Sequence, residues 1–229
     1  MKQMNVFPEC NVDTNLVGYI LGGYVKHKST CNEVAKAVNK SNEFAIGIID
    51  ADKRMATLDS GFEKYDNGCG VDGENVHITM YIHSDRKRFM FSVKPAMDKF
   101  LLDAAKQLGI NLKDAGYPST LEAFKKETKR IQAAEDPKLR NLFAMIRDYE
   151  ELQRFRNTLK YLMNKQYDVD IDIAKSFFDG TLTNKDLRNY LGSAELIFSH
   201  RQRVADVAPH SDDNDENPPD FGQGKTKFP

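Results

Sequence analysis

The sequence predicts an α/β fold in which a parallel-sheet domain with a β-hairpin is followed by an α-helical C-terminal region. Residues 44–49 (FAIGII) are apolar at every position, which is typical of a strand covered on both faces in a parallel sheet. Segments with helical spacing of apolar residues precede this strand along the chain. After residue 119 the apolar residues recur every three or four positions, so helices alone are expected there.

The first third of the chain reads as alternating strands and helices. A short apolar run predicts a strand over residues 4–8, and helical spacing of apolar residues predicts a helix over 13–21. Gly22 and Gly23 end that helix, and a second helix is expected over 29–38. The buried strand at 44–49 completes the unit, which is typical of an α/β domain.

A hairpin is expected in the middle of the chain. Residues 55–75 are rich in glycine and show no firm periodicity, so a loop is predicted there. Residues 76–83 alternate apolar and polar side chains, and 89–93 form a second short apolar run after the charged turn 84–88. A helical stripe over 97–108 follows the hairpin.

Three regions are expected along the chain: an α/β domain over residues 1–118, a helical appendage over 119–205 and a disordered acidic tail over 206–229. Two of the helices of the appendage are predicted at about 170–179 and 184–205. The tail shows no apolar period. The apolar stripe of the appendage is most simply a helix-packing face, although a long stripe also suits a homodimer seam or a protein partner.

Composition limits the classes of partner. The 229 residues are 40% hydrophobic and 29% charged, which excludes bulk disorder. The net charge of −1 divides unevenly: residues 1–118 hold 15 Lys+Arg against 15 Asp+Glu, 119–205 hold 16 against 13, and 206–229 hold 2 against 6. Because the excess of +3 before the tail is small, nucleic-acid binding would need a local basic patch or a bound metal.

The same sequence predicts a cytoplasmic protein without a membrane partner. No stretch approaches the ~18 to 20 uncharged apolar residues of a membrane span, and the first ten residues lack the apolar core of a signal peptide. The cysteines, Cys10, Cys31 and Cys69, are odd in number and show no metal-ligand spacing. Reduced thiols are therefore expected, rather than disulfides or a zinc site.

Acidic residues follow the two predicted parallel strands. Glu9 comes directly after the first strand, and Asp50 and Asp52 follow the second in FAIGIIDADKR. In an open parallel sheet the functional crevice lies beyond the carboxyl ends of the strands, so these side chains are expected at one edge. Two residues of extended chain span ~6.6 Å, which allows both aspartates to reach one divalent cation. Mg²⁺ is the expected ion because it prefers oxygen ligands and is commonly held by one or two carboxylates.

These residues resemble a known family. Residues 6–13 (VFPECNVD) and 48–52 (IIDAD) are similar to the motifs of the Toprim domain, which is found in topoisomerases, bacterial primases, small ribonucleases and overcoming-lysogenization-defect nucleases. That family has a glutamate after its first strand and a DxD motif after a later one. The resemblance covers roughly residues 1–118. Cys10 stands where the family usually has glycine, and an antiparallel hairpin at 76–93 departs from the family's parallel continuation.

The resemblance implies a metal-dependent role for four residues. Asp50 and Asp52 would hold Mg²⁺ or Mn²⁺, and Glu9 would act as a general acid/base or as a further ligand. The resemblance implies less strongly that Asp13, four residues beyond the glutamate, is also a ligand. A cation bound there could activate a water molecule and neutralise charge on a phosphodiester in the transition state.

Basic residues supply candidate contacts to a nucleic-acid substrate. Lys53 and Arg54 follow the DxD motif and could contact a phosphate, although a solvated turn explains them as well. Arg86, Lys87 and Arg88 occupy the predicted hairpin turn, where they could follow a nucleic-acid backbone. Charge on an exposed sheet edge is also an ordinary protection against aggregation.

The sequence therefore indicates a Mg²⁺-dependent enzyme, or a module derived from one, that acts on phosphodiester bonds of DNA or RNA, with a nuclease as the first expectation. The alternative is a non-catalytic protein-interaction module of a phage, mobile element or defence system. A third reading is a nucleotide-binding regulator without hydrolysis. No GxSxG, HExxH or kinase signature is present, so serine hydrolases, zinc proteases and kinases have no support.

Overall fold

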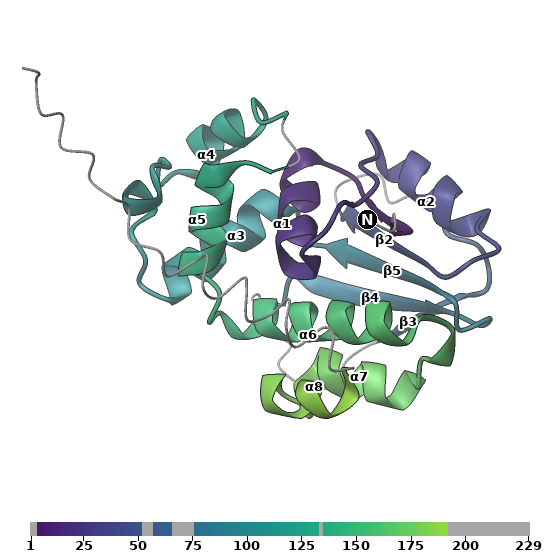
Figure 1. The fold of residues 1–229 in the computed structure, drawn as a ribbon. Coiled ribbons are helices and arrows are strands. Elements are labelled where there is room, and N and C mark those ends of the chain that lie inside the picture. Colours follow the sequence, from purple (N-terminus) through teal and green to yellow (C-terminus); the bar gives the residue numbers. More distant parts are fainter. Residues whose placement is uncertain (1–3, 52–56, 66–75, 133–134, 192–229) are drawn as a thin grey trace, which may run out of the picture.

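The computed structural model describes residues 4–51, 57–65, 76–132 and 135–191. Its centre is a five-stranded mixed sheet with the strand order β1-β2-β5-β4-β3 (Figure 1). β1 runs parallel to β2 and β2 parallel to β5, whereas β4 is antiparallel to both β5 and β3. The strands are β1 (Val6–Pro8), β2 (Ala45–Asp50), β3 (Phe62–Tyr65), β4 (Ile78–His83) and β5 (Arg88–Val93). The α/β class, the parallel pairing of the first two strands and the hairpin are confirmed.

Helices surround the sheet and confirm most of the ranges expected from periodicity. The helices are α1 (Asn11–Leu21), α2 (Cys31–Asn39), α3 (Met97–Gln107), α4 (Leu121–Thr128), α5 (Pro137–Met145), α6 (Glu150–Lys165), α7 (Ile171–Asp179) and α8 (Asn184–Tyr190), with 3-10 turns η1 (Leu112–Ala115) and η2 (Gln166–Asp168). The predicted helix over 184–205 begins as expected. Its remainder from residue 192, and the tail expected to be disordered, lie outside the described residues.

The loop expected over residues 55–75 is wrong for Phe62–Tyr65, which forms β3. This strand pairs antiparallel with β4 at the edge of the sheet, with Phe62 opposite His83. Its two central residues, Glu63 and Lys64, are charged and exposed. A four-residue edge strand with a charged centre carries too short an apolar pattern to be recognised by periodicity.

β2 lies between two hydrophobic layers, which explains its uninterrupted apolar sequence. Ala45 and Ile49 pack with α2 on one face, whereas Ile46 and Ile48 join the larger core on the other. Gly47 belongs to the α2 face: a Cβ atom there would lie 2.5 Å from the sulfur of Met90. The same Cβ would lie 2.8 Å from Val34 Cγ1 in α2, so a side chain at this position would clash with the helix that packs on this face.

The helices after residue 119 share one hydrophobic core with the sheet. The ring of Phe91 in β5 lies 5.3 Å from that of Phe155 in α6 and 6.1 Å from that of Phe178 in α7. α6 runs along the sheet, and α7 and α8 pack on its outer side (Figure 1). The apolar stripe of the helical region is buried in this core: Leu139, Leu142, Phe143, Ile146, Leu152, Phe155, Leu159 and Leu162. Across the described residues, no helix combines the length and apolar character needed to cross a membrane.

A buried histidine joins β4 to helices α3 and α6. His77 Nδ1 lies 2.9 Å from Glu151 Oε2, and its Nε2 lies 2.9 Å from Asp103 Oδ2. Glu151 Oε1 also accepts the backbone N–H groups of His77 and Ile78, at 2.7 and 2.8 Å. Burial lowers the pKa of His77, but the hydrogen bonds with Glu151 and Asp103 outweigh it, so the pKa is raised above its ordinary value. The protonated ring can donate to both carboxylates at once.

His77 predicts a specific dependence of stability on pH. Because its pKa is raised in the folded state, the folded protein binds more protons than the unfolded chain above about pH 6.5. The stabilisation is complete below that pH and is lost as the pH rises through the folded-state pKa. The difference in unfolding free energy between the unmodified protein and His77→Gln should therefore shrink as the pH rises above about 6.5 and through the folded-state pKa. Urea unfolding at several pH values measures it, and a difference that stays constant or grows would contradict the assignment.

Candidate metal centre

The structure brings Glu9, Asp13 and Asp50 to one edge of the sheet. Glu9 directly follows β1, and its backbone N–H donates to the carbonyl of Ile48 in β2 at 3.0 Å. Asp50 is the last residue of β2, and Asp13 lies in the first turn of α1. Because β1 and β2 are parallel, with Pro8 opposite Ile48, their carboxyl ends meet at this edge. We call Glu9, Asp13 and Asp50 the acidic edge.

A backbone N–H group orients each carboxylate of the acidic edge. Glu9 Oε2 accepts the N–H of Asp50 at 3.0 Å, and Asp13 Oδ2 accepts the N–H of Cys10 at 3.1 Å. Asp50 Oδ1 accepts the N–H of Met97 at 2.9 Å, at the start of α3. The positive end of the α3 dipole therefore favours a negative charge on Asp50. Each of the three carboxylates thus accepts at least one backbone N–H group.

Asp13 is the most unusual group of the acidic edge. Its side chain is fully buried, and Oδ1 has no hydrogen-bond partner among the described residues. Burial raises the pKa of Asp13 well above its ordinary value, the charge of Asp50 raises it further, and that of Glu9 adds to the effect. A buried carboxyl group that has one unpartnered oxygen and lies beside two others is stabilised when a proton or a bound cation neutralises its charge.

Cys10 has a structural role at the same place. Its Sγ accepts the backbone N–H of Asp13 at 3.4 Å and so caps α1 in a reciprocal pair with the Asp13 carboxylate. Burial raises the pKa of the Cys10 thiol, and the charge of Asp13 raises it further, so the thiol stays protonated. Cys10 is therefore neither a thiolate ligand nor a nucleophile here.

The donor chemistry of the acidic edge fits a hard cation, although the described residues do not complete a ligand shell. Within the described ranges, no three His, Cys, Asp or Glu residues are placed so that they could share a metal ion. Asp52, predicted as a ligand, lies outside the described residues. Mg²⁺ commonly uses one or two carboxylates and keeps several waters, so carboxylate oxygens at this edge suit it.

The predicted basic contacts do not gather at the acidic edge in the described part of the chain. Arg88, at the start of β5, pairs with Ala45, whereas Asp50 pairs with Val93 at the other end of the same two strands. Five residues of strand separate these ends by ~17 Å. The structure therefore places Arg86, Lys87 and Arg88 at the opposite end of the sheet, while Lys53 and Arg54 lie outside the described residues.

The hairpin turn has its own structural contacts. Arg88 is 9% exposed; its Nε donates to Asp85 Oδ2 at 2.8 Å and its Nη1 donates to the carbonyl of Asn39 at 2.7 Å. Arg86 has a positive φ of 59° within the turn, and Lys87 lies over the ring of Tyr167. Arg88 thus ties the hairpin to the end of α2.

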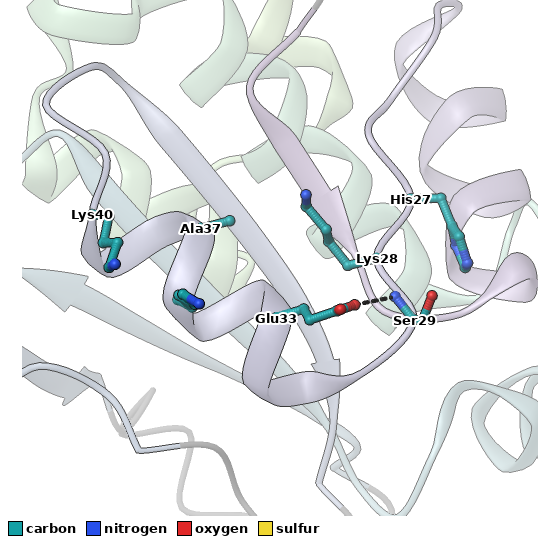
Figure 2. Close-up of a pocket in the computed structure, with 7 residues that line it drawn as sticks. His27, Lys28, Ser29, Glu33, Ala37 and Lys40 are labelled. Atoms are coloured by element: carbon teal, nitrogen blue, oxygen red, sulfur yellow. Dashed lines mark hydrogen bonds between the residues drawn. The ribbon is translucent and has the colours of Figure 1, made fainter.

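A basic groove beside the acidic edge was missed by the sequence interpretation. It has a volume of about 410 Å³ and runs between α2 and the segment that follows α1 (Figure 2). Its lining residues are His27, Lys28, Ser29, Glu33, Lys36, Ala37 and Lys40. The predicted helix over 29–38 contains Lys36 but not Lys40, which is the C-cap residue of α2 in the structure, so their four-residue spacing on one face was a weak signal.

No protein-family model, curated protein or solved structure matches this chain. Membership of the Toprim family therefore stays a prediction that depends on residues 6–13 and 48–52. In the structure, a glutamate and an aspartate emerge from neighbouring parallel strands at one edge. The antiparallel β4–β5 hairpin is the structural departure from it.

Proposed function

We propose that this protein is a divalent-cation-dependent enzyme that hydrolyses phosphodiester bonds of nucleic acids, with Mg²⁺ or Mn²⁺ bound at the acidic edge. The observation that carries this proposal is Asp13, a fully buried carboxylate with an oxygen that has no partner among the described residues, beside Asp50 and Glu9. Burying such a group in its charged form is unfavourable unless a positive charge compensates it, and a bound cation would do so. Buried ionisable groups with strongly shifted pKa values, such as Asp13, are typical of functional sites.

We assign the binding of the cation to the aspartates of this region. Asp13 and Asp50 would hold the ion, together with Asp52 from the segment after β2. When bound, the cation would neutralise charge developing on the phosphoryl oxygens and lower the pKa of a water molecule. Asp50 is oriented for this role by the N–H of Met97, and Asp13 by that of Cys10. Ligands held by the backbone lose little further freedom when an ion binds.

Glu9 is suited to proton transfer. Its Oε2 accepts the backbone N–H of Asp50, which keeps the carboxylate beside the proposed ligand. From that position the carboxylate can accept a proton from an attacking water or hold a water molecule of the cation. A carboxylate in either role must lie within hydrogen-bond reach of that water.

The proposal is tested by cleavage of labelled single-stranded DNA, duplex DNA and RNA with Mg²⁺, with Mn²⁺ and after removal of metal by EDTA. Cleavage of at least one substrate is expected with either cation, together with its loss in EDTA and its return when the cation is restored in excess. Asp172→Asn, at a position whose side chain is 94% exposed, is the control for an aspartate-to-asparagine change at the acidic edge, and it should cleave normally. Equal cleavage in EDTA, or none of any substrate with either cation, would contradict the proposal.

A further inference from the structure

The groove beside the acidic edge has walls fixed by the backbone. On one side, the N–H groups of Lys26 and Lys28 donate to the carbonyls of Val6 and Pro8, both at 2.9 Å, so this segment extends along the free edge of β1. On the other side stands α2, which packs against the sheet through its buried face. Figure 2 shows the two walls with the groove between them. A ligand would therefore meet a preformed site.

The groove carries an excess of positive charge, with Lys28, Lys36 and Lys40 against Glu33. Lys28, Lys36 and Lys40 have no carboxylate within 4.0 Å in the part of the chain that the structure describes. The acidic lining residue, Glu33, already accepts the backbone N–H of Ser29 at 2.9 Å (Figure 2). Lysines left without counter-charges around a concave surface attract anions by focusing the electrostatic field.

One end of the groove reaches the acidic edge. The backbone N–H of Lys28 donates to the carbonyl of Pro8, the residue directly before Glu9. His27 Nδ1 lies 3.0 Å from the hydroxyl of Thr14, the residue after Asp13. An anion at the Lys28 end of the groove therefore lies near the proposed metal ligands, whereas Lys40, next to Asn39 at the end of α2, lies toward the opposite end of the sheet.

We infer that this groove binds the phosphodiester backbone of a nucleic-acid strand and leads that strand to the acidic edge, an inference that rests on the proposed function. The residues that carry it are Lys28, Lys36 and Lys40. Lysine contacts to phosphates carry no sequence information, so binding is independent of sequence and weakens with salt. The described groove lining contains no tryptophan, tyrosine or phenylalanine, so base stacking contributes little there.

The test is the affinity of the triple variant Lys28→Gln, Lys36→Gln, Lys40→Gln for single-stranded and duplex DNA, measured in EDTA over a range of salt concentrations. Glutamine keeps most of the apolar stem and removes only the charge. The slope of log K against log salt for duplex DNA should fall in magnitude by about 2 to 3, and the affinity at low salt should fall at least about tenfold. The matched control is Lys106→Gln, Lys113→Gln, Lys129→Gln, which removes the same charge from exposed positions elsewhere.

The outcomes separate this inference from the proposed function. Because binding is measured in EDTA, it does not depend on cleavage, and thermal unfolding of both triple variants shows whether they are folded. Equal loss of affinity in the groove variant and the control, or no binding of DNA by the unmodified protein, would overturn the inference while leaving the cleavage assay to decide the proposed function. A larger loss of affinity and of salt slope in the groove variant than in the control supports it.

Discussion

Asp13→Asn is expected to lower the rate of metal-dependent cleavage by about a hundred- to a thousand-fold without lowering the stability of the metal-free protein. The asparagine oxygen can still accept the N–H of Cys10, so the cap of α1 is kept. Burial and the charges of Asp50 and Glu9 raise the pKa of Asp13 and so disfavour its charged form, which asparagine cannot adopt; the metal-free folded state should therefore be as stable as before or more stable. Cleavage rates with Mg²⁺ and thermal unfolding in EDTA measure the two effects.

Asp172→Asn provides the matched control, since it makes the same chemical change at an exposed position. It should leave both cleavage and stability unchanged. An Asp13→Asn variant that cleaves at the normal rate would show that Asp13 is not a ligand of the catalytic cation. A variant that loses activity only because it unfolds would show that the carboxylate supports the fold rather than an ion.

Glu151→Ala is expected to lower the unfolding free energy by about 3 to 5 kcal/mol, because it leaves a buried charged partner and two backbone N–H groups unpaired. The carboxylate accepts the N–H groups of His77 and Ile78 and contacts the ring of His77, so its loss affects β4, α3 and α6 together. Urea unfolding near pH 6.5 measures the effect. For a protein of this size the melting temperature should fall by roughly 6 to 20 °C.

The neighbouring residue offers a sharp control for this prediction. Glu150 lies one residue earlier in the first turn of α6, and its side chain is 83% exposed. Its pair with Arg154, at 3.9 Å on the surface, contributes little. Glu150→Ala should cost less than about 1 kcal/mol. Similar losses for both variants would show that the buried carboxylate is no more important than a surface charge.

The elements with long, regular patterns were predictable from sequence because the cause of their structure is local. The apolar run of β2 reflects cover on both faces, and the helical stripe of α6 reflects one buried face. β3 was not predictable because its pairing with β4 crosses a long connection and its own four residues carry little pattern. The contact between His77 and Glu151 was not predictable either, because the two residues are 74 positions apart in the sequence.

Part of the candidate site followed from the rule that parallel strands end at one edge, which places Glu9 beside Asp50. The burial of Asp13 was not predictable, because it depends on how α1 packs against the core. The structural role of Arg88 was missed because its contact, the carbonyl of Asn39, is a backbone group 49 residues away. The groove lies between α2 and the extended segment that follows α1, and no local sequence pattern predicts that these two elements lie side by side.

The most direct measurement of the central claim, that the acidic edge binds a divalent cation, is anomalous diffraction from a crystal of the full chain soaked in Mn²⁺. We predict an anomalous peak at about 2.0 to 2.5 Å from a carboxylate oxygen of Asp13 or Asp50, absent from crystals of Asp13→Asn. Manganese peaks elsewhere on the molecule with none at this edge would contradict the claim.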